Sequence, residues 1–236
     1  MPARYRRVVI KVSGESLAAD SRFGIDAGLA GRICDNLAAI CRMGIEVALV
    51  VGGGNFWRGR GEGDIGRVTS DNIGMLATAM NGLYLRDMME SRGIKARLQS
   101  AVAMEPMAGL HDARKVVGWL GSGEIVIFVC GLNLPYLSTD TTAAQRAVEI
   151  GADVILMGKS VDAVYDVDPN MHTNAVKYDR ITYGEIMAKK IGIIDMASAA
   201  ICNENGIEMI LYDAGEPRNM IDAVLGEVSG TVISPG

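Results

Sequence analysis

The strongest indication of the fold is the segment Val47-Ala48-Leu49-Val50-Val51-Gly52-Gly53-Gly54. Its five apolar residues, most of them β-branched, predict a strand that is buried on both faces, and three glycines follow it directly. Strands of this kind belong to parallel sheets covered by helices, and such sheets bind ligands beyond the carboxyl ends of their strands. The glycine run therefore lies where a ligand-binding loop is expected.

The same pattern continues on both sides of this stretch. Short apolar runs predict further strands at residues 8–12, 95–100, 125–129, 154–157, 207–211 and 231–233. Apolar residues at helical spacing predict helices at residues 25–40, 71–90, 111–120, 139–150, 182–189, 195–204 and 217–225. This alternation predicts an α/β fold with a mostly parallel central sheet covered on both faces, in a single domain over residues 1–236.

The composition is that of a protein with a large core. The chain has 236 residues, of which 49% are hydrophobic, and a formal net charge of −5. This negative charge argues against nucleic acid as the main partner. No apolar run approaches the roughly 18 residues of a membrane span, and the first residues do not form a signal sequence. We therefore expect a cytoplasmic protein that does not enter a membrane.

The cysteines and histidines do not suggest a metal or redox site. The four cysteines show no paired spacing, and Cys34 and Cys41 share a helical pattern that favours core packing. The two histidines, His111 and His172, are remote in sequence. Zinc chemistry and Ser-His-Asp catalysis are not expected, and no metal-ligating residues are predicted.

Lys11 stands at the end of the first predicted strand, and Ser13 and Gly14 turn the chain directly after it. Glycine lets backbone N–H groups approach phosphate oxygens, and lysine supplies a compact positive charge. The alternative is a strand that ends in a polar turn with Lys11 in solvent.

The run Gly52-Gly53-Gly54 gives up side-chain packing at three successive positions. A simple turn needs one glycine at most, so close approach of a ligand to the backbone explains the run better. Arg58 follows within reach, and its planar guanidinium suits phosphate.

Ser138, Thr139 and Asp140 open a predicted helix. These residue types are good helix caps, which is one explanation for them. A helix N-terminus with several hydroxyl groups is also an anion site, where Asp140 would orient Lys11 or hold a metal through water. Asp71, which stands before another helical run, has the same two explanations.

Two common nucleotide-binding motifs match only superficially. Residues 61–66 read G-x-G-x-x-G, but they do not follow a strand directly and would turn two acidic side chains toward a pyrophosphate. Gly158-Lys159-Ser160 is like the end of a phosphate-binding P-loop, but Asp153 occupies the position of the required first glycine.

Taken together, these segments resemble the amino acid kinase superfamily and, within it, the bacterial-type UMP kinases (uridylate kinases). The resemblance covers essentially the whole chain. Its most specific part is Gly74–Gly82, because sister kinases for amino acids or carbamate lack this run. The other matching segments are Lys11–Glu15, Gly52–Gly59, Pro135–Ala144, Val161–Tyr165 and Asp168-Pro169.

The resemblance implies a three-layer α/β/α sandwich, assembled as a homohexamer, that moves the γ-phosphate of ATP to UMP. The products would be UDP and ADP, in a step of pyrimidine nucleotide biosynthesis. The implied ATP-binding residues are Lys11, Val12, Ser13, Gly14, Gly54, Arg58, Lys159, Tyr165 and Asp168. The implied UMP-binding residues are Gly53, Asp71, Leu132, Asn133, Leu134, Pro135, Tyr136, Leu137, Ser138 and Thr139, with Asp71 assigned to the ribose hydroxyls.

The family is commonly activated by GTP and inhibited by UTP, so the resemblance implies both effectors as partners. The residues that match effector or subunit-contact positions are Phe23, Gly24, Arg86, Asp87 and Arg97, together with the region Ala19–Gly24.

The chain also departs from the commonest family pattern. Many members have Gly-Thr-Gly-Asn-Pro where this chain has Gly131-Leu132-Asn133-Leu134-Pro135. Lys159 stands where threonine or asparagine is frequent, and Ala163 replaces a usual glycine.

The implied reaction needs no general base, because a phosphate oxygen of UMP is already ionised near neutral pH. Catalysis then consists of placing two anions in line and neutralising charge on the transferring group. We assign the main electrostatic role to Lys11, helped by Mg²⁺ bound as MgATP, and expect Asp140 to orient Lys11 or the hydrated Mg²⁺.

Two other functions stay open from the sequence. One is a superfamily kinase for another small acid or phosphate, against which the Gly74–Gly82 similarity argues. The other is a nucleotide-binding storage or regulatory protein, because the superfamily includes metal-oxoanion storage relatives. The presence of both Lys11 and Asp140 argues against this second function.

Overall fold

A nine-stranded sheet runs through the computed structural model, which describes residues 4–18, 21, 23–58, 65–227 and 229–236. The strand order across the sheet is β4 (Gly109–Leu110), β3 (Ala96–Ser100), β5 (Ile125–Val129), β2 (Glu46–Val51), β1 (Arg7–Val12), β6 (Val154–Lys159), β10 (Glu208–Asp213), β11 (Thr231–Ser234) and β9 (Arg180–Thr182).

The sheet is mostly parallel, as predicted. β1 lies at its centre and pairs in parallel with β2 on one side and β6 on the other. The direction changes only at β11, which pairs antiparallel with β10 and parallel with β9. A separate two-stranded hairpin joins β7 (Val164–Tyr165) to β8 (Lys177–Tyr178).

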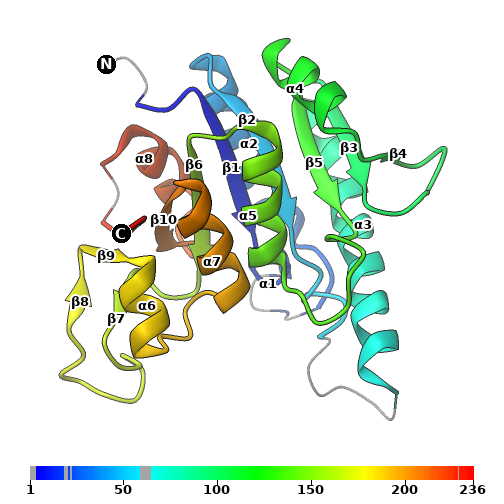
Figure 1. The fold of residues 1–236 in the computed structure, drawn as a ribbon. Helices are drawn as coiled ribbons and strands as arrows, with labels where there is room; N and C mark the ends of the chain where they lie inside the picture. The colour runs from blue at the N-terminus through cyan, green and yellow to red at the C-terminus, as the bar shows by residue number, and fades with distance from the viewer. Residues whose placement is uncertain (1–3, 19–20, 22, 59–64, 228) are drawn as a thin grey trace.

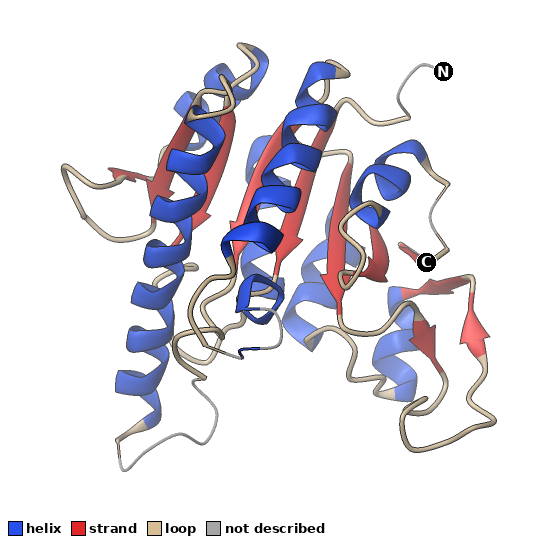
Figure 2. Cartoon of the chain, turned by 180° about the vertical axis from the view of Figure 1, so that it is seen from behind, coloured by secondary structure: helices blue, strands red, loops and turns tan. Residues whose placement is uncertain are grey.

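Helices cover both faces of the sheet, which confirms the predicted three-layer α/β/α sandwich (Figures 1 and 2). One face carries α2 (Ala27–Arg42), α3 (Arg67–Glu90) and α8 (Asn219–Leu225), and these helices are in front in Figure 2. The other face carries α4 (Ala113–Gly121), α5 (Thr139–Ile150), α6 (Tyr183–Lys189) and α7 (Met196–Asn205). The short helix α1 (Glu15–Ala18) follows β1.

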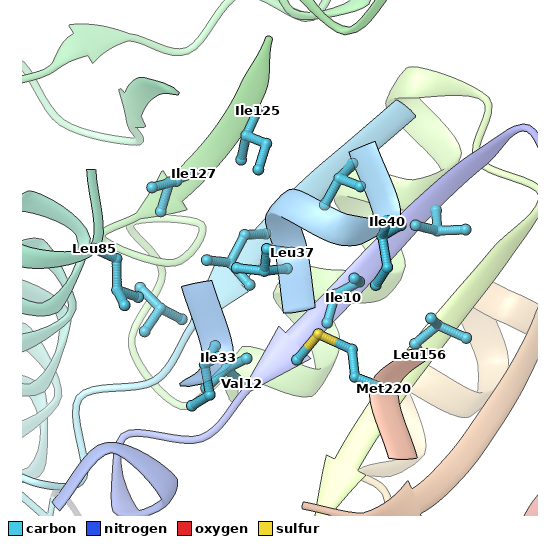
Figure 3. Close-up of a cluster of buried hydrophobic side chains, with 14 of the residues drawn as sticks. Ile10, Val12, Ile33, Leu37, Ile40, Leu85, Ile125, Ile127, Leu156 and Met220 are labelled. Atoms are coloured by element: carbon cyan, nitrogen blue, oxygen red, sulfur yellow. The ribbon is translucent and has the colours of Figure 1, made fainter. Parts of the chain in front are cut away.

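The core beneath α2 shows how β1 divides its side chains between the two faces. Ile10 and Val12 pack toward α2, together with Leu37 and Ile40 of that helix (Figure 3). Each fully buried aliphatic side chain of this kind contributes about 1.5–3 kcal/mol. Val9 packs on the opposite face, so alternation along the strand directs Lys11 to that face as well.

The predicted elements agree with the structure except at some ends, in the shortest strands and at the four-residue helix α1, which was not predicted. Helix α3 begins at Arg67 rather than at 71, with Gly66 at its N-cap. Asp71 is therefore inside the helix, and its interpretation as a cap is wrong. Strands β4, β7, β8 and β9 were not predicted, because two or three residues are too few to show a period.

Several sequence features lie outside the described residues. These are residues 61–64 of the G-x-G-x-x-G match, Gly59, and the positions Ala19, Asp20 and Arg22 of the proposed effector region. Within the described part of the chain, the four cysteines are free, and no helix is both long and apolar enough to cross a membrane.

Candidate active site

Two lysines reach the same face of the sheet at its carboxyl edge. Lys11 is the last but one residue of β1, and Lys159 ends the neighbouring strand β6. Both follow the alternation of residues that pack on the α5 face, namely Val9 in β1 and Met157 in β6. Helix α5 crosses this face, and its first turn lies where both strands end.

Asp140, in the first turn of α5, lies between the two lysines. The Nζ of Lys11 is 3.2 Å from one carboxylate oxygen, and the Nζ of Lys159 is 2.5 Å from the other. Lys11 and Asp140 are both 6% exposed. Two ammonium groups share one carboxylate, so the cluster carries a surplus positive charge close to the positive end of the α5 dipole. This arrangement suits an anionic ligand.

Burial and the neighbouring charges act against each other in this cluster. Burial raises the pKa of Asp140, but the Lys11 and Lys159 ammonium groups outweigh it and hold that pKa below its usual range. Burial, aided by the charge of Lys11, lowers the pKa of Lys159 in spite of the attraction of Asp140. The carboxylate is therefore ionised at neutral pH.

The start of α5 is held by α7. Ser138 is the N-cap of α5 and accepts a hydrogen bond from the Asp140 amide at 3.0 Å, which confirms the capping interpretation for this residue. The Ser138 hydroxyl also donates to Asp195, and the Thr141 hydroxyl donates to the same carboxylate at 2.8 Å. Asp195 in turn caps α7 through the Ser198 amide at 2.7 Å. The sequence analysis did not identify Asp195 as a support of the site.

Tight backbone packing explains part of the three-glycine bend. A Cβ on Gly52 would lie 2.8 Å from the Gly14 nitrogen, and one on Gly53 would lie 2.6 Å from the Gly74 carbonyl oxygen of α3. Gly54 is different, because its nearest neighbour would be the Glu15 side chain at 3.4 Å. Backbone packing therefore accounts for Gly52 and Gly53 but not for Gly54, whose predicted contact with a ligand stays a prediction.

A buried amide pair attaches the bend to α3. Asn55 and Asn81 exchange side-chain hydrogen bonds of 2.9 and 2.7 Å, and Asn81 also donates to the Gly52 carbonyl at 2.7 Å. Both side chains are almost completely buried. The second bond of Asn55 goes to the Gly24 carbonyl at 2.8 Å.

The bend separates two pockets. The central pocket has a volume of about 550 Å³ and is lined by Lys11, Ser13, Gly14, Glu15, Ser16, Gly52, Gly53, Gly54, Thr139, Gly158, Lys159, Ser160, Asp213, Ala214 and Gly215. The α3 pocket has a volume of about 160 Å³ and is lined by Gly53, Gly54, Trp57, Asp71, Gly74, Met75, Thr78, Gly131, Leu132, Leu134, Leu137, Ser138, Thr139 and Thr142. The two pockets share Gly53, Gly54 and Thr139, so their contents would meet beside the lysine pair.

The α3 pocket lies between α3 and the loop that follows β5. Most of the predicted UMP-binding residues line it: Gly53, Asp71, Leu132, Leu134, Leu137, Ser138 and Thr139. Asn133, Pro135 and Tyr136 belong to the same loop but not to the lining. The loop turns sharply, with φ angles of 57° at Asn133 and 70° at Tyr136.

Asp71 connects the two walls of the α3 pocket. Its carboxylate accepts a hydrogen bond from the Tyr136 amide at 2.8 Å. The Nε of Arg67, one helical turn earlier, lies 2.8 Å from both carboxylate oxygens. Nothing in the sequence analysis singled out Arg67.

A third, outer pocket of about 460 Å³ contains two more of the predicted ATP-binding residues. Tyr165 and Asp168 line it together with Val161, Ala163, Asp166, Val167, Pro169, Asn170, Lys189, Lys190, Ile191, Gly192 and Ile193. The Tyr165 hydroxyl donates to Asp162 at 2.9 Å, and Asp168 accepts from the Asn170 amide at 2.9 Å. The first lining residue of the outer pocket, Val161, follows Ser160 directly, and Lys159 before it ends β6.

Two predicted ATP-binding residues have other surroundings. The Val12 side chain is buried in the core beneath α2 and does not line the central pocket. The guanidinium of Arg58 pairs with Glu15 at 3.2 Å, and Glu15 lines the central pocket.

The predicted effector residues lie in the segment before α2 (Phe23 and Gly24), on α3 (Arg86 and Asp87) and on β3 (Arg97). Phe23 packs edge-to-face on Phe56, with ring centroids 5.7 Å apart, and the Gly24 amide donates to the Asn55 carbonyl at 3.0 Å. Arg86 donates to the Met107 carbonyl at 3.0 Å, and Asp87 is exposed on the same helix. Arg97 pairs with Glu124 at 2.5 Å.

The fold and the site together define a class: an α/β/α protein with two adjoining pockets at the carboxyl edge of its sheet and positive charge where the pockets meet. Comparison of the sequence with known families narrows this class further. The model of the amino acid kinase family matches residues 6–213, and the chain belongs to that family.

Curated relatives match this chain along almost their full length. The chain is 42% identical over 231 residues to the uridylate kinases of Psychrobacter cryohalolentis and Psychrobacter arcticus, covering 97% of this chain and 96% of each relative. Its fold matches the solved UMP kinase from Bacillus anthracis with a TM-score of 0.93 and 33% identity, covering 98% of this chain and 96% of that one. The UMP kinase from Ureaplasma parvum gives a TM-score of 0.92 and 32% identity, covering 98% of this chain and 99% of that one.

Proposed function

We propose that this chain transfers the γ-phosphoryl group of ATP to a phosphate oxygen of UMP, giving UDP and ADP. The observation that carries the proposal is the Lys11–Asp140–Lys159 cluster at the junction of the central and α3 pockets. The names of the relatives, uridylate kinase and UMP kinase, support it at 42% and 33% identity.

The geometry explains how the residues would act. ATP phosphates would occupy the central pocket and the UMP phosphate the side of Thr139, with the backbone N–H groups of Gly54 and of the α5 N-terminus directed at them. The ammonium groups of Lys11 and Lys159 would neutralise charge on the transferring group, and Asp140 would hold both in place. Adenosine would extend from Lys159 toward the outer pocket.

Magnesium bound as MgATP fits this set of residues. Mg²⁺ usually takes one or two carboxylates and completes its ligands with substrate phosphates and water. Asp213 and Glu15 bring carboxylates to the central pocket, whereas Asp140 is already engaged by two lysines. When bound, Mg²⁺ would neutralise phosphate charge.

The finer predictions are proposals with their own support. Val68, Leu76 and Met80 form an exposed apolar stripe on α3, which supports assembly into a homohexamer and is checked by light scattering. We also propose activation by GTP, inhibition by UTP and a cytoplasmic location, in pyrimidine nucleotide biosynthesis.

Measuring ADP release with ATP and UMP, CMP or dCMP in turn tests the function. We expect turnover with UMP to exceed turnover with the other two acceptors. A kinase for another acceptor would give no UMP-dependent ADP, and a storage or regulatory protein would bind nucleotide without turnover. Either result would sink the proposal.

Replacing Asp71 with alanine is expected to raise the KM for UMP by about 10- to 100-fold, because hydrogen bonds to a charged group contribute about 1.5–3 kcal/mol. The carboxylate lines the α3 pocket and does not line the central pocket, so the KM for ATP should stay within about twofold of the wild type. Steady-state kinetics with each substrate varied in turn measure both constants.

The control for this variant is Glu90→Ala, which removes an exposed carboxylate from the far end of the same helix. It should leave both constants unchanged. An Asp71→Ala protein with a lower Tm but an unchanged KM for UMP would show that Asp71 is only structural.

A further inference from the structure

Arg67 and Tyr136 form a contact across the mouth of the α3 pocket, with Asp71 between them. The Arg67 Nε lies 2.8 Å from both oxygens of Asp71, and the Tyr136 amide donates to one of these oxygens at 2.8 Å. The Arg67 guanidinium also lies over the Tyr136 ring, 5.2 Å from its centroid. One arginine thus touches both walls, α3 and the loop after β5.

Helix stability does not explain this arginine. Arg67 is the first residue of α3, where a positive charge opposes the helix dipole, and the N-cap residue Gly66 makes no side-chain capping bond. The pair also has its base on the N-terminal side of its acid, which is the less favourable order at this spacing. Arg67 therefore lowers the stability of the start of α3 and still contacts both walls of the α3 pocket. A role in the pocket explains this side chain better than a role in the helix.

The contact fixes the direction of the Asp71 carboxylate. Arginine presents a rigid planar set of donors, and its ring contact with Tyr136 restricts it further. The Asp71 side chain is 14% exposed, whereas that of Arg67 is 35% exposed and does not line the pocket. Arg67 therefore acts on the pocket through Asp71 and Tyr136 rather than by touching its contents.

We propose that Arg67 is a positioning residue that holds the Asp71 carboxylate toward the ribose hydroxyls of the nucleoside monophosphate and helps the enzyme to distinguish ribose from deoxyribose. This inference rests on the proposed function. A carboxylate accepts hydrogen bonds from both hydroxyls of a ribose only when its oxygens are held in place. Small displacements of groups that position a substrate lower the reaction rate.

The test compares UMP with dUMP in Arg67→Met and Arg67→Lys. Arg67→Met should raise the KM for UMP about tenfold through the misplaced charged hydrogen bond, with the KM for ATP unchanged. It should also lower the ratio of kcat/KM for UMP to kcat/KM for dUMP. The reason is that deoxyribose lacks a hydroxyl that would donate a hydrogen bond to Asp71. Arg67→Lys keeps the charge without the planar donors and should fall between the wild type and Arg67→Met.

Arg218→Met is the matched control. Arg218 also stands at the start of a helix, and it pairs with Asp222 four residues later at 3.2 Å. It lies on α8 and lines neither the central nor the α3 pocket. Its replacement should change neither KM nor the UMP to dUMP ratio.

The outcomes separate the inference from the function it rests on. An unchanged ratio in both Arg67 variants, or equal increases in the KM values for UMP and ATP together with a lower Tm, would overturn the positioning role alone. A wild-type protein that does not use UMP would overturn both proposals.

Discussion

Replacing Lys11 with alanine is expected to lower turnover with ATP and UMP by about 10²–10³-fold, which corresponds to about 2.7–4 kcal/mol of transition-state stabilisation. Lys11 lies at the junction of the two pockets and is 6% exposed, so its charge is poorly screened by water. Single-turnover kinetics with saturating nucleotides measure this step.

The fold should survive this replacement. Asp140 keeps its 2.5 Å contact with Lys159, so no buried carboxylate is left without a positive partner. Circular dichroism and the Tm check this point. Lys115→Ala, which removes an exposed lysine from α4, serves as the control and should keep full turnover. Turnover within threefold of the wild type in Lys11→Ala would remove Lys11 from its proposed role.

Replacing Asp140 with asparagine is expected to impair both catalysis and folding. It leaves the buried ammonium groups of Lys11 and Lys159 without a counter-charge, and breaking a buried pair in this way costs about 3–5 kcal/mol. The released lysines also lose their alignment, so turnover should fall by at least as much as in Lys11→Ala. Chemical denaturation and the same single-turnover assay measure the two effects.

The lowered pKa of Asp140 also predicts how the stability of the protein changes with pH. The pKa of Asp140 is below its usual range in the folded state, so its contribution is present above the unfolded pKa and is lost as pH falls through the folded pKa. Asp140→Asn should therefore lose less stability on acidification than the wild type. The Tm measured across the acidic range shows this as a flatter curve.

A double variant separates the two roles of Asp140. Asp140→Asn combined with Lys159→Met removes one of the two uncompensated ammonium groups and should regain part of the lost stability without regaining turnover. If Asp140→Asn alone is as stable and as active as the wild type, the cluster is not the electrostatic centre of the site.

Much of the fold is readable from the sequence because the long elements show clear periods. The apolar runs of β1, β2 and β5 and the helical spacing of α2 predict a covered parallel sheet. The short edge strands could not be found in this way. The early start of α3 was missed because its first turn, from Arg67 on, contains mostly polar residues.

The site was predicted less completely, because its contacts join distant segments. Lys11 could be selected from its place at a strand end, and Asp140 from its place at a helix start. The partnership of Asp140 with Lys159 depends on which face of the sheet α5 covers, although the alternation in β6 offers a signal for it. The contacts of Gly53 with α3 and of Arg67 with the loop after β5 follow only from the tertiary structure.

The reciprocal Asn55–Asn81 amide pair has a mechanical consequence. Together with the tight contact of Gly53 on Gly74, it joins the glycine bend and the long helix into one rigid body. A rotation or translation of α3 is therefore expected to move the glycine bend with it. A displacement of the outer surface of that helix is thus expected to shift the place where the two nucleotides would meet.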